Sequence, residues 1–460
     1  MTESSALQPR ARWSGKWAFI LAAAASAVGL GNLWRFPYLA AKYGGGTFLL
    51  TYLVLVFTFG ISLLLVETAL GRKTRLSTIG AYKVYGRKFA FIGVLASLVP
   101  FLITPYYCII GGWVTKYLAS YVAGGATTLA DGGGYFVSFI SQNQTFFWTI
   151  LFMACVFFVV ARGVKGGIEK ANVVMMPLLI LMAAGLAIFT LCQPGALEGA
   201  AYYLTPDFSK FSPELLIAAM GQMFYSLSLA MGIMVTYGSY LDKKESLTHA
   251  TTRIGVFDIG VSFLAGLMIV PAAFMALGSG EAVAENAGPG LMFIILPELF
   301  TSLGSLANVF GAVFFLLVFF AALTSAISLT ETCVSIVADG LKCTRKRAMV
   351  ISFTFFILAG ILVNLGYNGL SFIQPLGEGS TILDFVDFLS NSVMMPIVAL
   401  LTCIFVGWII KPQELISEIK EGSSFKLEKA WVVMVKYVAP VLVVVILVAF
   451  VGSAFGVISF

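Results

Sequence analysis

The sequence has little charge and almost no histidine. Only 11% of its 460 residues are Asp, Glu, Lys or Arg, and the single histidine, His249, has no cysteine or acidic cluster near it. The six cysteines are scattered, mostly within apolar runs, and form no CxxC pair. These absences argue against a zinc site and a disulfide framework. The net charge of +6 does not indicate a nucleic-acid partner, because the basic residues are dispersed at the ends of apolar runs.

Long apolar runs dominate what is present. The chain is 59% hydrophobic, with a mean hydropathy of +0.96, which is typical of a polytopic all-α membrane protein. A β-barrel is excluded because the apolar residues do not alternate in short strands. The polar start, 1–13, followed by a full-length apolar run argues against a cleaved signal peptide. Eleven segments are expected to cross a bilayer: 15–41, 47–71, 89–123, 145–161, 172–192, 214–240, 249–277, 306–339, 346–365, 382–410 and 429–457.

Basic residues predict the orientation of these segments. Arg10, Arg12 and Lys16 precede the first segment, and basic residues recur after every second segment, whereas the other connections carry few. The positive-inside rule then places the N-terminus in the cytoplasm and the C-terminus outside the plasma (inner) membrane. We expect a cytoplasmic segment at 1–14, a core at 15–410, and a cytoplasmic loop with an eleventh helix at 411–460.

The first apolar segment contains a stretch that an unbroken helix tolerates poorly. Gly29 and Gly31 lie two residues apart, followed by Asn32 and Arg35. Glycine weakens a helix, and backbone groups freed inside a membrane need polar partners. A kink packed by small residues is the alternative explanation. Arg35 favours a binding site instead, because an arginine is costly to leave in lipid.

The sixth apolar segment is interrupted in a similar way. Polar and small residues occupy the middle of 222–232, including Ser226 and Ser228, although such serines often only bond to their own helix. The first and sixth segments begin two successive groups of five, about 15–192 and 214–410. An odd repeat length inverts the second group, and paired interruptions in inverted halves indicate a transporter's central site.

Three further polar features lie within predicted membrane segments, and we expect them to face the same cavity as the two interruptions. Asp258 lies in the seventh segment, where an unpaired carboxylate is costly. Thr324 and Ser325, with Ser328 and Glu331 on the following turns, form a polar face of the eighth segment, unless they serve only in helix packing. Tyr107 in the third segment is either a site residue or a packing residue. Carboxylate, amide, hydroxyl and freed carbonyl oxygens together suit a hard monovalent cation.

Four motifs resemble the neurotransmitter:sodium symporters, in particular their bacterial LeuT-type amino-acid members. They are AVGLGNLWRFPY at 27–38, GGGTF at 44–48, GQMFYSLSL at 221–229 and FFAALTSAISL at 319–329. The resemblance implies a LeuT-type 5+5 inverted repeat with broken helices 1 and 6. It also implies sodium-coupled amino-acid symport by alternating access, with two sodium ions and no organic cofactor. A monomer would be sufficient for transport.

The resemblance assigns ion and substrate ligands residue by residue. The first sodium site would use Ala27, Asn32, Ser226 and Asp258. The second would use Ala25, Val28, Ala321, Thr324 and Ser325. The substrate site would comprise Ala27, Leu30, Gly31, Ile103, Tyr107, Tyr225, Ser226, Ser228, Met231, Ser325 and Leu329.

The same comparison indicates the kind of substrate. Gly29 stands where monoamine carriers have an aspartate, which favours a substrate that brings its own carboxylate. Tyr107 and the Leu30 and Gly31 amides would bind that carboxylate. Met231 provides an adaptable wall that admits a hydrophobic or aromatic side chain.

Two pairs of charged residues would close the site in turn. Arg35 and Asp387 would form an external ion pair. A cytoplasmic pair would join Arg10 to Asp339, supported by Tyr240 and Trp13, although exposed pairs of this kind contribute little stability. Glu67 is expected to hydrogen-bond the interrupted part of helix 6.

Asp258 replaces the asparagine that animal members have beside their chloride, near Tyr52, Gln222, Ser226 and Ser262. Because a carboxylate and a chloride would repel each other there, transport is expected to be independent of chloride, and Asp258 could carry a proton on the return step. The alternatives are a proton-coupled amino-acid transporter and, less favoured, an ion channel. An enzyme is not expected, because no histidine or metal cluster supports a catalytic pair.

Overall fold

A computed structural model describes residues 11–278 and 290–454, and within these ranges the chain is helical with no β-strand. Nine of the described helices are long and apolar enough to cross a membrane. A tenth span is formed by two helices, α1 (Lys16–Ala27) and the helix that starts at Gly31, which are bent by 50° relative to each other. The remaining predicted segment, the sixth, is α12 (Pro213–Ser226) followed by α13 (Ile233–Gly238). The predicted all-α membrane fold is confirmed.

The first five segments follow the predicted ranges closely. They are α1 with a π-helical turn (Gly31–Arg35) and α2 (Phe36–Lys42); α3 (Gly46–Leu55), a π-helical turn (Val56–Gly60) and α4 (Ile61–Thr74); α6 (Ala90–Val122); α9 (Gln144–Ala161); and a π-helical turn (Val164–Glu169) with α10 (Lys170–Leu191).

The second five and the last segment do the same. They are α12 with α13; α14 (Leu247–Leu277); α17 (Ala307–Gly340); α18 (Arg345–Leu365); α19 (Ile382–Asp387), a π-helical turn (Phe388–Met394), α20 (Met395–Ile404) and a second such turn (Phe405–Ile409); and α22 (Glu428–Val433), a π-helical turn (Met434–Val438) and α23 (Ala439–Ala454).

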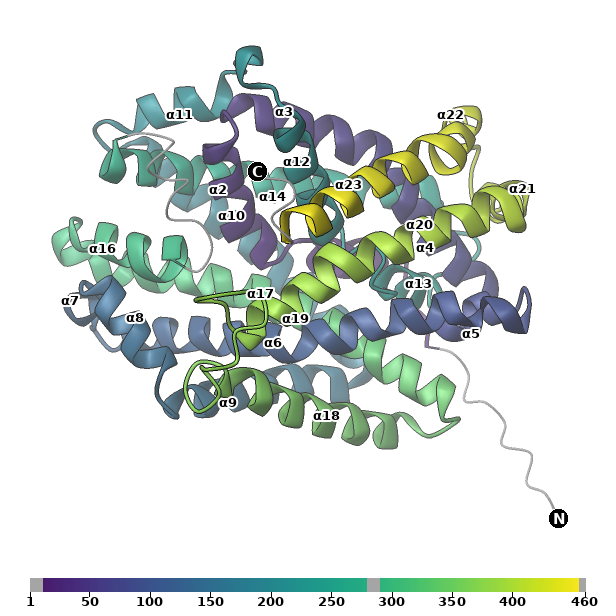
Figure 1. Cartoon of the computed structure of the whole chain (residues 1–460), viewed down its shortest axis with the longest axis horizontal. Coiled ribbons are helices and arrows are strands. Elements are labelled where there is room, and N and C mark those ends of the chain that lie inside the picture. The colour runs from purple at the N-terminus through teal and green to yellow at the C-terminus, as the bar shows by residue number, and fades with distance from the viewer. Residues whose placement is uncertain (1–10, 279–289, 455–460) are drawn as a thin grey trace.

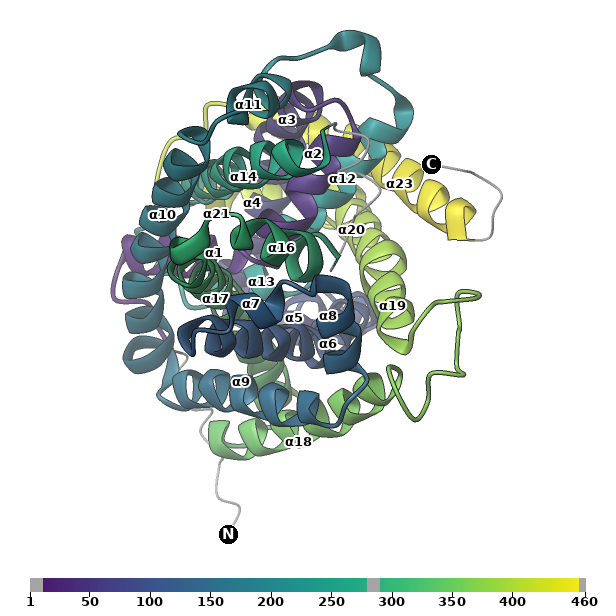
Figure 2. The same ribbon diagram turned by 90° about the vertical axis from the view of Figure 1, so that its left-hand side faces the viewer.

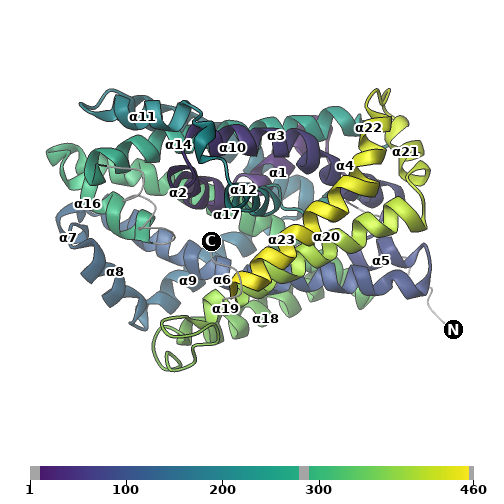
Figure 3. The ribbon, with the colours of Figure 1, turned by 45° about the horizontal axis from the view of Figure 1, so that its top comes forward.

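The short connecting helices separate into two groups at opposite ends of the bundle. Figure 1 shows α5 (Thr78–Lys83) and α21 (Gln413–Lys420) at one end, and α7 (Ala126–Leu129), α8 (Gly132–Ile140), α11 (Ala196–Leu204) and α16 (Leu296–Thr301) at the other. Figure 3 shows the same separation. The end with α5 and α21 carries the basic connections, so we call it the cytoplasmic end. The sixth segment enters from the opposite end to the first, as an inverted repeat requires.

Hydroxyl side chains start several of the spanning helices. Ser212 accepts a hydrogen bond from the Leu215 amide at 3.2 Å and so caps α12. Thr381 and Asp384 form a reciprocal capping box at the start of α19. These caps satisfy amides that have no partner within the helix, which matters where water is scarce.

The broken helices lie inside the bundle. Figure 2, seen along the bundle from the end opposite α5, shows α1, α13 and α17 near the centre and α18 and α23 at the edge. All the described residues of α1 from Ala22 to Ala27 are buried. The unwound parts of the first and sixth segments are therefore shielded from lipid by protein, which is where non-helical backbone is tolerated.

Candidate functional site

The first break separates α1 from the turn at Gly31. Helix α1 ends at Ala27, and Val28 has an extended backbone with φ −79° and ψ 100°. The side-chain oxygen Oδ1 of Asn32 accepts a hydrogen bond from the freed amide of Gly29 at 3.0 Å. Asn32 therefore satisfies one amide that the break exposes, and its NH₂ group remains available for other partners.

The second break is wider and uses left-handed backbone. After α12 ends at Ser226, Ser228, Ala230 and Gly232 have φ values of 54°, 60° and 71°. The Ala230 amide donates to Glu67 Oε1 at 2.6 Å. The predicted bond between Glu67 and the interrupted part of helix 6 is thus confirmed, and it stabilises a conformation that is strained for serine and alanine.

The two breaks meet at a buried polar cluster around Asp258. Asn32 Nδ2 lies 2.8 Å from Asp258 Oδ1, 2.9 Å from Ser226 Oγ and 2.8 Å from Ser262 Oγ. Tyr52 donates its hydroxyl to Asp258 Oδ2 at 2.7 Å, and Ser226 donates to Oδ1. Asp258 is fully buried and forms no ion pair with a described lysine or arginine. A buried carboxylate without a cationic partner is a natural position for a bound cation.

A second cluster of oxygen atoms lies where α1 meets α17. Ser325 Oγ lies 3.2 Å from the Ser26 carbonyl oxygen and 3.4 Å from that of Val28. Thr324 donates to the Ala321 carbonyl at 3.1 Å. The described residues contain no group of three or more His, Cys, Asp or Glu side chains suited to a metal ion. Hydroxyl and carbonyl oxygens instead fit a hard ion such as sodium.

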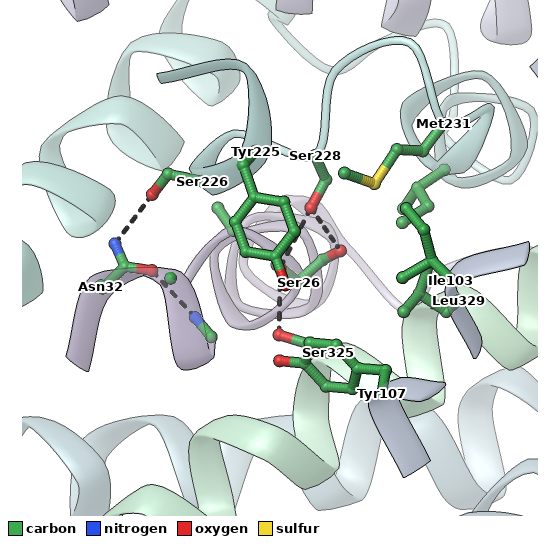
Figure 4. Close-up of a pocket in the computed structure, with 14 residues that line it drawn as sticks. Ser26, Asn32, Ile103, Tyr107, Tyr225, Ser226, Ser228, Met231, Ser325 and Leu329 are labelled. Carbon is green, nitrogen blue, oxygen red and sulfur yellow. Dashed lines mark hydrogen bonds between the residues drawn. The ribbon is translucent and has the colours of Figure 1, made fainter. Parts of the chain in front are cut away.

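A small cavity of about 20 Å³ lies between these two clusters. This volume has room for about one or two water molecules, so a larger solute requires the lining side chains to move outward. Figure 4 shows Tyr225, Ser228 and Met231 on one side of the cavity and Tyr107 with Ser325 on the other. The lining includes ten of the eleven predicted substrate residues: Ala27, Gly31, Ile103, Tyr107, Tyr225, Ser226, Ser228, Met231, Ser325 and Leu329.

Leu30, the remaining predicted substrate residue, does not line this cavity. Its backbone amide donates to the Tyr107 hydroxyl at 3.2 Å. Two groups predicted to bind a carboxylate are therefore adjacent and bonded to one another. Of the predicted second-sodium residues, Val28, Ala321, Thr324 and Ser325 belong to the α1–α17 cluster, and Ala25 is fully buried in the last turn of α1.

A separate cavity of about 260 Å³ lies on the side of Tyr225 away from the cytoplasmic end. Arg35 and Asp387 both line it, but they form no direct ion pair within 4.0 Å. Asp387 Oδ1 instead accepts hydrogen bonds from Tyr106 at 2.9 Å and from Asn391 at 2.6 Å. The predicted external pair is therefore open in this structure, because the cavity separates its two members.

The cytoplasmic side is closed by a hydrogen-bonded network. Trp13 Nε1 donates to the Tyr237 carbonyl at 3.0 Å, and its ring lies 6.0 Å from that of Tyr240. The Tyr240 hydroxyl donates to Glu331 Oε1 at 2.9 Å, and Glu331 forms an ion pair with Arg345. Glu331 is fully buried. The network joins the first, sixth, eighth and ninth segments.

Only part of the predicted cytoplasmic pair can be described. Arg10 lies outside the described residues. Asp339 accepts a hydrogen bond from the Ser77 amide at 2.8 Å, which ties the end of α17 to the start of α5. Trp13 and Tyr240, predicted to support the pair, are neighbours in the network described above.

Sequence reasoning placed two residues of α17 at the wrong depth and overlooked one partner. Ser328 and Glu331 share a helix face with Thr324, but they bond to Tyr237 and to Arg345 on the cytoplasmic side and do not line the central cavity. The overlooked partner is Arg345, at the start of α18. The sequence feature that could have identified this partner is its position, fourteen residues after Glu331, at the start of the next predicted segment.

Comparisons with known proteins agree with this geometry. A family model described as the sodium:neurotransmitter symporter family matches residues 10–126 and 137–455. The chain is 36% identical to YhdH, an uncharacterized sodium-dependent transporter of Bacillus subtilis, over 97% of this chain and 98% of the relative. An uncharacterized sodium-dependent transporter of Haemophilus influenzae is 34% identical over 96% of this chain and 98% of its own. The solved structure of MhsT in complex with L-phenylalanine matches with a TM-score of 0.85 and 35% identity, over 95% of this chain and 99% of that chain.

Proposed function

The chain belongs to the sodium:neurotransmitter symporter family, a family of membrane transporters and not of enzymes, and we propose that it takes up a neutral amino acid with sodium. The proposed substrate is hydrophobic or aromatic, and two sodium ions drive its inward movement through the plasma membrane. The membrane potential contributes about 2.3 kcal/mol per charge per 100 mV to that movement.

One observation carries the proposal: both helix breaks converge on the oxygen atoms around Asp258. Asn32 contacts the first break, through the Gly29 amide, and also Ser226 at the end of α12. A sodium ion bound beside Asp258 would hold both halves of the site, and a substrate carboxylate would complete its coordination. Each ligand would then raise the affinity for the other, which is the coupling that symport requires.

The cavity walls support an amino acid with an apolar side chain. We infer that the Tyr107 hydroxyl and the Leu30 amide, which are hydrogen-bonded to each other in this structure, would bind the substrate carboxylate, and that Ile103, Met231 and Leu329 would contact its apolar side chain. Gly29 has no side chain, so the site lacks a carboxylate at this position and suits a substrate that brings its own. MhsT, which has the same fold, has been solved with L-phenylalanine. The flexible Met231 side chain can move to admit a side chain of that size.

Uptake into proteoliposomes tests the proposal. We expect saturable uptake of radiolabelled leucine, phenylalanine, tyrosine or tryptophan that requires an inward sodium gradient, and competition among these four but not by glycine, lysine or glutamate. Uptake driven by a proton gradient without sodium would instead support a proton-coupled transporter. Unsaturable flux of sodium without substrate would support a channel.

Chloride independence follows from the position of Asp258 and is a further part of the proposal. Its carboxylate already accepts hydrogen bonds from Tyr52, Ser226 and Asn32, three groups that could otherwise bind an anion. A second buried negative charge there would be repelled. The same carboxylate could take up a proton once sodium leaves, which would give proton antiport on the return step.

Replacing Asp258 by Asn tests this charge directly. We predict that D258N lowers uptake about tenfold or more in chloride-free buffer, because the fixed negative charge is lost, and that chloride restores a large part of it. Uptake by the unmodified protein should not change with chloride. The variant S262A, which removes a hydroxyl of the same cluster but no charge, should not acquire a chloride requirement, even if its uptake falls. Equal activity of D258N with and without chloride would refute the role of Asp258.

A further inference from the structure

A second cavity lies away from the substrate path, between the second, seventh and eleventh spanning segments. Its volume is about 420 Å³, and its walls come from α4 with the preceding turn, the start of α14, and the chain from 424 to 434. The transport cycle proposed above uses none of the residues that line it. Figure 3 shows α22 near α4 at the end of the bundle that carries α21, so the cavity lies in the cytoplasmic half of the spanning region.

One part of this cavity is apolar and faces the lipid side of the bundle. Phe57, Ile61 and Leu65 follow one another along the second segment, which gives an apolar wall about 12 Å long. The opposite wall is fixed by Trp431, whose Nε1 donates to the Ser62 carbonyl at 3.1 Å. Phe57 is 43% exposed, whereas Trp431 is 4% exposed. An acyl chain could lie along this wall.

The other part of the cavity is polar and basic. His249 on the first turn of α14 and Lys426 in the loop before α22 both line it, together with the hydroxyl groups of Thr248 and Ser424. None of the described residues that line the cavity is acidic, and Glu428, next to the loop that carries Lys426, forms an ion pair with Lys420 at 2.6 Å.

The loop that carries Lys426 is held against α14. Ser246 donates to Ser423 Oγ at 2.8 Å, and Thr248 Oγ1 lies 3.2 Å from the same oxygen. The ring of Phe425 packs edge-on against Trp431 with a centroid distance of 5.7 Å. The basic end is therefore fixed relative to the apolar wall, although its residues belong to segments far apart in the sequence.

We propose that this cavity binds one anionic phospholipid from the cytoplasmic leaflet of the bilayer. Its phosphate group would lie beside His249 and Lys426, and one acyl chain would follow Phe57 and Ile61. Charge complementarity selects the anionic headgroup, because the basic groups at this end face no lining carboxylate. The apolar wall selects a lipid over a free phosphate, which would leave that wall uncovered.

Native mass spectrometry of the purified, delipidated full-length protein tests the site, with phosphatidylglycerol and phosphatidylcholine as probes. We expect one tightly retained phosphatidylglycerol and at least about fivefold weaker binding of phosphatidylcholine. The double variant H249A/K426A should lose this preference. Both residues are exposed, so the fold should be unaffected. The matched control is K429A, which removes an exposed lysine that does not line the cavity.

A second variant separates the apolar part from the basic part. A430W places a bulky ring in the cavity from an exposed position, and it should reduce retention of both lipids while sodium-dependent uptake persists. Unchanged phosphatidylglycerol retention in A430W would refute the site. Equal retention of the two lipids, or an undiminished preference in H249A/K426A, would refute recognition of the anionic headgroup. Because the readout is lipid retention, failure of the proposed transport activity would leave the result interpretable.

Discussion

The two sides of the substrate cavity are built differently. On the external side, Tyr225 separates the central cavity from a larger one of about 260 Å³, and Arg35 and Asp387 line that space without direct contact. On the cytoplasmic side, the Tyr240–Glu331–Arg345 network fills the corresponding position. The structure is therefore closed at the end that carries the basic connections and hollow at the opposite end.

This difference indicates what each half of an alternating-access cycle requires. External closure needs Arg35 and Asp387 to approach each other, and it can gain an ion pair. Cytoplasmic opening must break contacts around a buried carboxylate, Glu331, which is costly unless ligand binding compensates. We therefore expect substitutions on the cytoplasmic side to change the balance of states more than substitutions on the external side.

The largest effect is predicted for R345A. Removing the guanidinium leaves Glu331 buried without its ion-pair partner, which costs about 3 kcal/mol and shifts the equilibrium toward a cytoplasm-open state by about 100-fold. Hydrogen exchange should accelerate in 11–27 and 233–241, and apparent substrate affinity from outside should fall.

The control for R345A is K346A, the adjacent exposed lysine, which should leave both measurements unchanged. Equal protection of the two peptides in R345A and in the unmodified protein would show that the buried pair does not hold the cytoplasmic side closed.

A smaller effect is predicted for G29A, at the boundary between the two sides. A Cβ atom at Gly29 would lie 2.6 Å from Ser325 Oγ and 2.9 Å from the Tyr107 hydroxyl, so both side chains would have to move. Overpacking of this kind costs about 1–3 kcal/mol, which corresponds to at least about a fivefold loss of substrate affinity. Equilibrium binding of radiolabelled substrate measures it.

The control for G29A is G185A, because no described atom beyond the backbone of its own helix lies within 4 Å of the added Cβ at that position. Unchanged affinity in G29A would mean that Ser325 and Tyr107 move freely, and that the close approach of α1 to α17 does not shape the site.

Much of this site was predictable from sequence, because its signals are local. The spans follow from apolar runs, and the first break follows from Gly29 and Gly31. Asn32 and Asp258 are 226 positions apart. The cost of polar groups in a membrane predicted that both face one cavity, whereas the family resemblance assigned them to the same sodium site.

The remaining features depend on depth and on conformational state. Spacing places Thr324 and Glu331 on one face of α17, but seven residues of helix separate them by about 10 Å, and only tertiary packing shows where the cavity ends. The sequence does not tell whether Arg35 and Asp387 are in contact or apart in a given structure, because the same chain adopts both conformations during transport.

The smallest equilibrium effect is predicted for D387N. An asparagine retains an oxygen that can accept from Tyr106 and Asn391, as Asp387 Oδ1 does, and no ion pair with Arg35 exists to be lost in this state. The affinity for substrate from outside should therefore stay within about twofold of that of the unmodified protein. The maximal uptake rate should fall about tenfold, because the Arg35–Asp387 pair stabilises only the externally closed state.

E378Q, on the nearby loop outside the cavity lining, should change neither quantity. A loss of binding in D387N as large as that in R345A would contradict the asymmetry between the two sides, because the external pair would then already contribute while the cavity is open.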